Sequence, residues 1–184
     1  KTSAPDALMS GAKMLQHLGW RANEPWIQEI DVPAEMDWSK TGLRNTMSPA
    51  EWERMGVRPR AGQWFANLPA SVIIPQGRKG PAFLAYPNFN VFLEWNQSLT
   101  YVLTAAYFST RLGGAPIFNE GNPEPGLDQP QMKQLQAKLN ADGFDVGEID
   151  GILGAGTRDA VREEQRRLGM PADAWPTAKL LNAL

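Results

Sequence analysis

The composition of this chain excludes several classes of protein. Its 184 residues, of which 42% are apolar, are enough for one ordinary domain, or for one domain and a small second one, with a real hydrophobic core. The formal net charge of -2 leaves no concentrated basic face to displace phosphate counterions, so we expect no nucleic-acid partner. The absence of cysteine excludes a disulfide scaffold and a thiol catalyst, and it leaves the redox compartment open. No apolar run approaches the roughly 20 residues of a membrane span, and no signal peptide or lipid-anchor motif opens the sequence.

A helix is predicted for residues 1–19. Ser3 or Thr2 can cap it, and Asp6 lies near the positive end of its dipole. His17 is the only histidine, so the chain cannot build a His-rich metal site, and we expect this side chain at the helix surface. The apolar stripe that we expect to be buried consists of Leu8, Ala12, Leu15 and Leu18.

The next 70 or so residues predict short strands and one short helix. Residues 26–32 alternate between apolar and polar side chains, as a strand does, and residues 71–74 and 82–85 read as two more strands. Residues 48–51 (Ser-Pro-Ala-Glu) form a capping-box pattern with proline at the first helical position, which indicates a short helix there.

One long helix is predicted for residues 88–113, with Asn88 as its N-cap and Gly113-Gly114 as its stop. Its apolar stripe comprises Phe92, Trp95, Leu99, Val102 or Leu103, and Ala106. A second face carries Glu94, Ser98, Tyr101 and Ala105, with Asn96 and Gln97 beside it. Polar groups next to aromatic rings suit a sugar ligand.

These residues resemble a known family. The segment FLEWNQSLTYVLTAAYFSTRL, preceded by GPAFLAYPNFNV, is similar to the end of the catalytic domain of lytic murein transglycosylases of the membrane-bound type B family. The resemblance extends over residues 1–119 through the motifs PDALMSGAKMLQHLGWRANEPW, SPAEWERMGVRP and LPASVIIPQGRKGPAFLAYPNF. It implies a mainly α fold with a small β component, the second half of a lysozyme-like α+β catalytic domain.

The resemblance also implies a chemistry. Enzymes of this family cleave the bond between N-acetylmuramic acid and N-acetylglucosamine without water and leave a 1,6-anhydromuramyl end. Their catalytic glutamate would lie upstream of Lys1, so we expect no catalytic residue in this chain, and Glu94 does not match the family motif. Asn96 matches the sugar-contacting asparagine, with Tyr101 and Trp95 as walls of the cleft. Each residue also has an alternative role that involves no ligand. The Asn96 side chain could hydrogen-bond only to nearby backbone, and the Trp95 ring could pack in the hydrophobic core.

A structural calcium ion is a further implication of the resemblance, and no other cofactor is required. In relatives an EF-hand-like loop precedes the first helix, and Asp6 matches its last ligand. The other ligands would lie upstream of Lys1, so a helix-start role for Asp6 is the favoured interpretation.

Residues 119–130 (NEGNPEPGLDQP) are rich in proline and glycine, so we place a domain boundary here. The predicted parts are residues 1–119, a linker of residues 120–130, and residues 131–184. The last part shows three apolar helical stripes and resembles the small all-α three-helix peptidoglycan-binding domain of wall enzymes. It departs from that family where Ala174, in place of glycine, follows Asp173, and we expect a looser turn there.

The loop between the first two of these helices has its own signals. We expect Gly143 to end the first helix, Asp150-Gly151 to make a tight turn and Thr157 to cap the second helix. A metal site of Asp150 with Asp142, Asp145 and Glu148 is the weaker alternative, because the spacing does not match an EF-hand loop.

The sequence therefore predicts the C-terminal part of a periplasmic lytic transglycosylase, with peptidoglycan strands and an upstream fragment of the same protein as partners and any outer-membrane anchor upstream. A non-catalytic peptidoglycan-binding fragment is the alternative, and a scaffold for other wall enzymes is a third possibility. Without the upstream fragment, the apolar faces of Leu8, Leu15 and the long helix would be uncovered, and the chain would be prone to aggregate.

Overall fold

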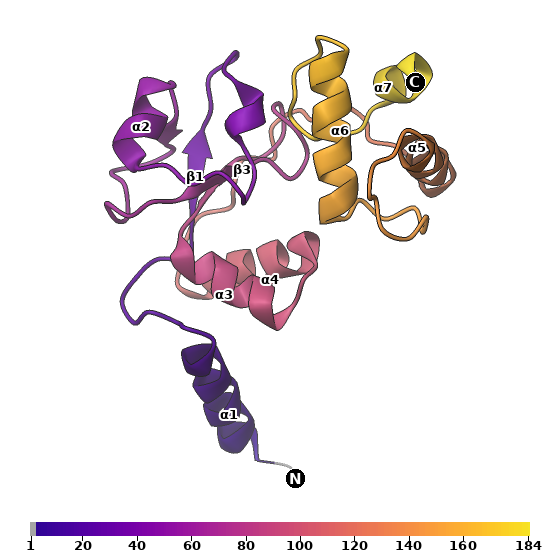
Figure 1. Cartoon of the computed structure of the whole chain (residues 1–184). Coiled ribbons are helices and arrows are strands. Elements are labelled where there is room, and N and C mark those ends of the chain that lie inside the picture. Colours follow the sequence, from indigo (N-terminus) through magenta and orange to yellow (C-terminus); the bar gives the residue numbers. More distant parts are fainter. Residues whose placement is uncertain (1–2) are drawn as a thin grey trace.

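The computed structural model describes residues 3–184 and consists of two parts (Figure 1). The first part contains the helices α1 (Ala4–His17), α2 (Pro49–Arg54), α3 (Pro87–Trp95) and α4 (Leu99–Leu112), and the 3-10 helix η1 (Trp38–Lys40). Its strands are β1 (Ile27–Asp31), β2 (Arg58–Pro59), β3 (Ser71–Ile73) and β4 (Phe83–Ala85). The second part contains α5 (Gln129–Ala141), α6 (Ala155–Arg167) and α7 (Ala178–Ala183). The fold is thus mainly α with a small β component, as predicted, and no helix within residues 3–184 is both long and apolar enough to cross a bilayer.

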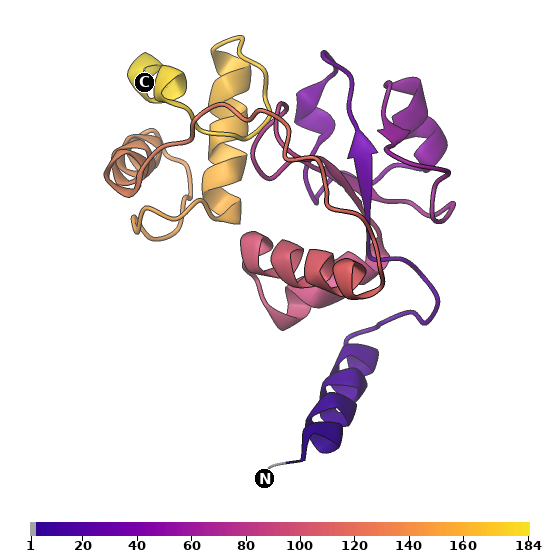
Figure 2. The same ribbon diagram turned by 180° about the vertical axis from the view of Figure 1, so that it is seen from behind.

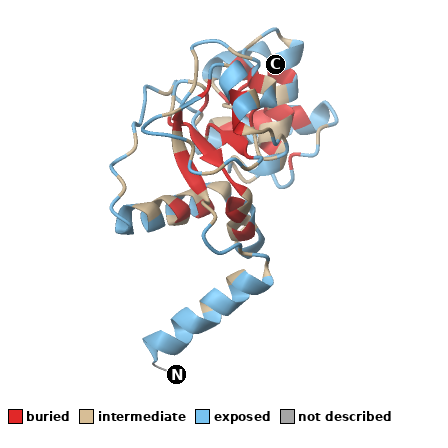
Figure 3. Ribbon diagram, turned by 90° about the vertical axis from the view of Figure 1, so that its left-hand side faces the viewer, coloured by how far each residue is buried: buried red, intermediate tan, exposed pale blue. Residues whose placement is uncertain are grey.

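The sheet is antiparallel, with the strand order β2-β1-β4-β3. The three strands predicted from alternation are β1, β3 and β4, and the predicted capping box of Ser48 and Glu51 opens α2. Side chains alternate between two apolar clusters along the strands, so both faces of the sheet are buried (Figure 3). One cluster packs under α2 and includes Ile30, Trp52, Val57, Val72, Leu84 and Tyr86. The other packs against α3 and α4 and includes Ile27, Ile73, Phe83, Phe89, Val102 and Ala106.

The long helix predicted for residues 88–113 is in fact two helices, so that prediction was wrong. Asn96 has an extended backbone (φ -148°, ψ 118°), and its Oδ1 accepts a hydrogen bond of 2.9 Å from the Ser98 backbone N–H. The Ser98 hydroxyl in turn accepts from the Tyr101 N–H and caps α4. Asparagine and serine side chains compete in this way with helical hydrogen bonds, which explains the break.

The N-cap assigned to this helix was also wrong, whereas its stop at Gly113 is confirmed. Tyr86 is the N-cap of α3, and Asn88 is fully buried. The Asn88 side chain accepts a hydrogen bond from the Arg21 N–H and donates to the carbonyls of Arg21 and Glu24. Asn88 therefore fixes the loop that follows α1 onto α3.

Helix α1 extends away from the rest of the molecule (Figures 1 and 3). Ser3 caps it as predicted, while the alternative cap Thr2 lies outside the described residues. None of its residues is buried, and Leu8 is 75% exposed, so the expected burial of its apolar stripe was wrong. Only the C-terminal end of the stripe is partly covered: Leu15 and Leu18 are half-buried where α1 contacts α3, and the Trp20 ring that follows lies 5.3 Å from that of Phe92. His17 is exposed, as predicted.

The second part closes on a core of its own. The predicted stripes supply this core, with Met132, Leu135, Leu139, Val161, Leu180 and Leu181 all buried. Gly143 and Gly151 adopt positive φ values of 93° and 81°, which confirms the helix end and the tight turn. Thr157, however, does not cap α6. Its side chain is fully buried under the loop, and the N-cap is Gly154.

The turn at Asp173 and Ala174 is also not loose, contrary to expectation. Ala174 has φ 59°, a left-handed conformation that favours glycine, and it is buried. The Asp173 carboxylate holds the turn, because Oδ1 accepts hydrogen bonds from the Trp175 N–H and the Gln165 amide. Its Oδ2 accepts from the Arg78 N–H in the loop between β3 and β4, so this turn connects the two parts.

Figure 2 shows the chain after α4 running across the back of the molecule to α5. This segment is held on both sides, even though its composition is that of a linker. The Lys79 carbonyl accepts a hydrogen bond of 2.8 Å from the Asn122 N–H, and Lys79 Nζ lies 2.7 Å from a Glu124 carboxylate oxygen. The Glu124 carbonyl accepts from the indole N–H of Trp175. The two parts therefore pack against one another along a seam, which we define by Gly77, Lys79, Glu124 and Trp175.

Candidate functional site

The corner between α3 and α4 exposes two aromatic rings. Trp95 ends α3 and Tyr101 lies in the first turn of α4, and their ring centroids are 5.7 Å apart. The two residues are 43% and 53% exposed, so the core does not use them as anchors. An exposed pair of rings offers the flat, amphipathic surface on which the apolar face of a sugar can stack.

Asn96 lies between these two residues in the sequence and is partly buried. Its Oδ1 is used by the Ser98 N–H, which is the alternative, backbone role predicted from the sequence. The Nδ2 group makes no hydrogen bond to any residue of the part that the structure describes, so it can donate to a hydroxyl or carbonyl of a ligand. One amide thus shapes the corner with its oxygen and offers its nitrogen outward.

Glu94 also belongs to this region but has a different setting. It is exposed, and it lies at the rim of a cavity between the two parts of the molecule. The corner therefore does not place Glu94 in the water-poor cleft that a catalytic acid of a transglycosylase requires.

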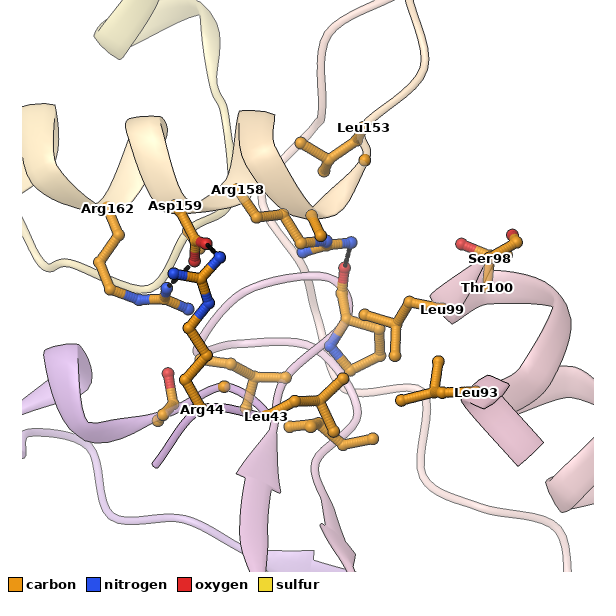
Figure 4. Close-up of a pocket in the computed structure, with 18 of the residues that line it drawn as sticks. Leu43, Arg44, Leu93, Ser98, Leu99, Thr100, Leu153, Arg158, Asp159 and Arg162 are labelled. Atoms are coloured by element: carbon orange, nitrogen blue, oxygen red, sulfur yellow. Dashed lines mark hydrogen bonds and ion pairs between the residues drawn. The ribbon is translucent and has the colours of Figure 1, made fainter. Parts of the chain in front are cut away.

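The cavity has a volume of about 620 Å³ and is formed by both parts of the chain (Figure 4). Residues 41–45 and the end of β3 form its floor, the α3–α4 corner forms one wall, and the start of α6 forms the other. The leucines Leu43, Leu93, Leu99 and Leu153 make much of the lining apolar, and its charged residues are three arginines and three carboxylates, namely Arg44, Arg158, Arg162, Glu94, Asp159 and Asp173.

The three arginines that line this cavity have different partners. Asp159 bridges two of them, with Arg44 Nη2 2.8 Å from its Oδ2 and Arg162 Nη1 3.0 Å from its Oδ1. Arg158 Nη2 donates a 2.9 Å hydrogen bond to the Pro75 carbonyl. Burial, together with the neighbouring Arg162, lowers the pKa of Arg158 to about 10, so this guanidinium still carries its charge at neutral pH.

Asp6, the predicted calcium ligand, does not make a metal site with the residues described. It is exposed near the start of α1, and no group of three histidine, cysteine or acidic side chains within residues 3–184 is arranged to hold a metal ion. Asp6 acts at the helix start, where its backbone N–H donates to the Ser3 cap.

Asp150 is explained by its turn. Its Oδ1 accepts hydrogen bonds from the Ile152 N–H at 2.7 Å and from the Gln136 amide at 3.3 Å. These bonds lower the pKa of Asp150, with the Ile152 N–H as the largest cause. The carboxylate thus holds the loop of the second part through these two hydrogen bonds.

Sequence reasoning named Trp95, Asn96 and Tyr101 but not the corner between two helices that exposes them, and it missed the cavity. The segments that form the cavity are far apart in sequence, and no pattern within one segment points to the others. One local signal was available: Arg158 lies in the first turn of α6, where the helix dipole disfavours a positive charge. An arginine in that position indicates that its side chain either pairs with a negative group or interacts with groups outside its own helix.

Comparisons with known proteins agree with the two parts of the structure. Residues 1–110 match the model of the transglycosylase SLT domain, and residues 128–184 match that of a putative peptidoglycan binding domain. Over 71 residues the chain is 32% identical to a spore cortex-lytic enzyme of Bacillus cereus, a match that covers 39% of this chain and 27% of that enzyme.

Two solved structures of SltB3 from Pseudomonas aeruginosa are similar over nearly the whole chain. They contain NAG-anhNAM-pentapeptide and NAG-NAM-pentapeptide, and in each case the TM-score is 0.83 with 37% sequence identity. The match covers 99% of this chain and 50% of SltB3, so the chain spans about half the length of that protein. With its match over residues 1–110, the chain belongs to the transglycosylase SLT domain family.

Proposed function

We propose that this chain is the C-terminal part of a peptidoglycan lytic transglycosylase. The observation that carries the proposal is the succession, in one chain, of a transglycosylase SLT domain and a peptidoglycan-binding domain. The exposed aromatic corner supports it, because a polysaccharide substrate needs rings to stack on and amides to bind its N-acetyl groups.

The reaction is the cleavage of the β-1,4 bond between N-acetylmuramic acid and N-acetylglucosamine. A carboxylic acid donates its proton to the glycosidic oxygen, and the bond from that oxygen to C1 of the muramyl residue breaks. The 6-hydroxyl of the same residue attacks C1 and loses its proton to the carboxylate, which gives a 1,6-anhydromuramyl end. We assign the proton donor to a glutamate of an upstream segment, because Glu94 is exposed.

This chain would supply binding and orientation to that reaction. Trp95 and Tyr101 would stack on sugar rings, and the free Nδ2 of Asn96 would donate to an N-acetyl carbonyl or a hydroxyl. The second part would hold the enzyme on an insoluble polymer and so raise the local substrate concentration, without acting on the bond that breaks.

An upstream segment of the same protein is the second partner that we propose, and its place is the apolar side of α1. Leu8 and Met9 are 75% and 60% exposed, and soluble proteins seldom leave such a face uncovered. We infer that the chain alone is prone to aggregate. A monodisperse preparation of the chain alone that melts cooperatively would contradict this inference. Because the substrate is wall polymer, we place the protein in the periplasm, with any lipid anchor in the upstream segment.

Two assays, carried out one after the other, test whether the protein is a lytic transglycosylase. Denaturing mass spectrometry of the purified particle shows whether an upstream polypeptide accompanies the chain. Sacculi are then digested with the particle and the products are analysed for 1,6-anhydromuropeptides. Release of these products supports the proposal, whereas reducing muramyl ends would indicate hydrolysis and overturn the lytic chemistry.

Asn96→Ala tests the sugar site within the intact enzyme. We expect slower digestion of sacculi, by about tenfold or more for a lost polar contact, with nearly unchanged wall binding. Asn140→Ala, the same change at an exposed position of α5, is the matched control and should leave both properties unchanged. An equal loss of digestion and wall binding in the Asn96 variant would show that Asn96 matters only for folding.

A non-catalytic wall-binding fragment is the second candidate function, favoured by the exposure of Glu94. Deletion of residues 120–184 distinguishes the roles of the two parts. In the intact enzyme we expect weaker binding to sacculi and unchanged cleavage of short soluble glycans. Unchanged binding to sacculi would remove the targeting role from the second part.

A further inference from the structure

The cavity between the two parts contains a positive charge without a negative partner. Arg158 makes no salt bridge with any residue from 3 to 184, and its one hydrogen bond goes to the neutral carbonyl of Pro75. Its Nε is buried and has no hydrogen-bond partner. Arg158 is half-buried, and its Nη1 makes no hydrogen bond to any residue from 3 to 184, so the guanidinium can donate to a ligand in the cavity.

The carboxylates near Arg158 are already engaged. Asp159 is shared by Arg44 and Arg162, as Figure 4 shows. Asp173 is buried and accepts from the Arg78 and Trp175 N–H groups and from the Gln165 amide. Glu94 lines the opposite rim and is exposed to water. The guanidinium of Arg158 is therefore left to face the cavity.

A second feature adds to the positive potential. Gly154 is the N-cap of α6, and no side chain caps the first turn of this 13-residue helix. Gly154 and Ala155 line the cavity, so the positive end of the helix dipole lies at its wall. The helix N-terminus and the guanidinium both favour an anion at one end of the cavity, and leucine side chains line part of the remaining space (Figure 4).

We propose that this cavity binds a carboxylate of the peptide stem of peptidoglycan, with Arg158 as its guanidinium partner. The inference rests on the proposed function, which supplies peptidoglycan as the ligand. A peptide stem combines carboxylates with the methyl groups of alanine, and it therefore matches a cavity with one cationic end and apolar walls. The volume of about 620 Å³ lies within the range of small-ligand sites. Because both parts contribute to the cavity, the site would read the peptide while the α3–α4 corner reads the sugars.

Isothermal titration calorimetry of the full chain with two ligands tests this inference. The ligands are NAG-NAM-pentapeptide and the NAG-NAM disaccharide without peptide. We expect the pentapeptide ligand to bind about tenfold more tightly, which is the order of one charge-assisted hydrogen bond. Arg158→Met should abolish this difference and leave disaccharide binding unchanged, and Arg158→Lys should retain only part of it, because lysine lacks the planar fork.

A second variant blocks the cavity without touching Arg158. Thr100 is exposed at the rim, so Thr100→Trp should fill the entrance and also abolish the preference for the pentapeptide ligand. Thr104→Trp, one turn further along α4 and outside the cavity lining, is the matched control and should retain the preference.

The outcomes separate this inference from the proposed function. Equal affinity of the unmodified chain for both ligands would overturn the peptide site alone, and so would a preference that persists in both Arg158→Met and Thr100→Trp. Failure to bind either ligand would overturn the peptide site together with the proposed function. Loss of the preference in both cavity variants, with melting temperatures close to that of the unmodified chain, supports the peptide site.

Discussion

Helix α1 and the three-helix second part have the same kind of sequence but opposite surroundings. Both carry apolar residues at helical spacing, and in the second part these residues meet one another, so that Leu135 and Leu139 are fully buried. On α1 the corresponding Leu8 is 75% exposed. An apolar stripe thus shows that a helix face needs cover, while the source of the cover depends on other segments. In the second part the cover is local, whereas no residue from 3 to 184 buries Leu8 on α1.

Truncation of one leucine in each region should show the largest contrast. Leu135→Ala removes a side chain from a closed core, so we expect the free energy of unfolding to fall by about 3 kcal/mol. Leu8→Ala should change it by less than about 0.5 kcal/mol, because the side chain is already in water. Urea unfolding followed by far-ultraviolet circular dichroism measures both. A large loss for Leu8→Ala would show that α1 is covered in solution.

Most features that depend on neighbouring residues could be predicted from the sequence, whereas features that depend on distant segments could not. The capping box of Ser48, the strands β1, β3 and β4 and the helices of the second part follow from local patterns and were found, whereas the two-residue strand β2 was not. The break at Asn96 was not found, because the apolar stripe continues across it and only the side-chain hydrogen bonds of Asn96 and Ser98 interrupt the helix.

The candidate site was predicted in part for the same reason. Trp95 and Tyr101 are close in sequence, and the corner brings them together. The cavity around Arg158 could not be predicted, since its walls come from segments that meet only when the two parts pack along the seam. Local patterns therefore indicated the two aromatic residues, and only tertiary structure showed the corner that exposes them and the cavity beside it.

The self-sufficiency of the second part also rests on a buried polar side chain. Gln136 is 1% exposed; its Nε2 donates to the Ile152 carbonyl at 3.1 Å and its Oε1 accepts from the Gly151 N–H at 2.8 Å. Gln136→Leu leaves these loop groups without partners, so we expect a loss of about 2 kcal/mol in unfolding free energy. Gln134→Leu, at an exposed position of α5, is the control and should have little effect. An equally small effect of both changes would show that the loop does not depend on Gln136.

The seam is an intermediate case, because there one part covers the other. A Cβ on Gly77 would lie 2.7 Å from the Trp175 Cβ, and Gly77 also has a positive φ of 76°. Gly62 has a similar φ of 67° with no atom near its Cβ position, so Gly62→Ala measures backbone strain alone. We expect Gly77→Ala to cost about 1 kcal/mol more than Gly62→Ala. Equal losses of unfolding free energy for the two variants, measured by urea unfolding, would show that the contact between Gly77 and Trp175 does not contribute to stability.

The smallest effect concerns Asp150 and the pH. In the folded chain its hydrogen bonds lower its pKa below the ordinary value of 3.8, whereas unfolding restores that value. The ionised carboxylate therefore stabilises the folded second part above that pH, and its contribution is lost as the pH falls through the lowered pKa. Asp150→Asn should melt at a lower temperature than the unmodified chain near neutral pH, and the two melting temperatures should approach each other as the pH falls below 3.8. A difference that stays constant down to that pH would assign the effect to the shape of the turn, since Asn can also accept from the Ile152 N–H but carries no charge to lose.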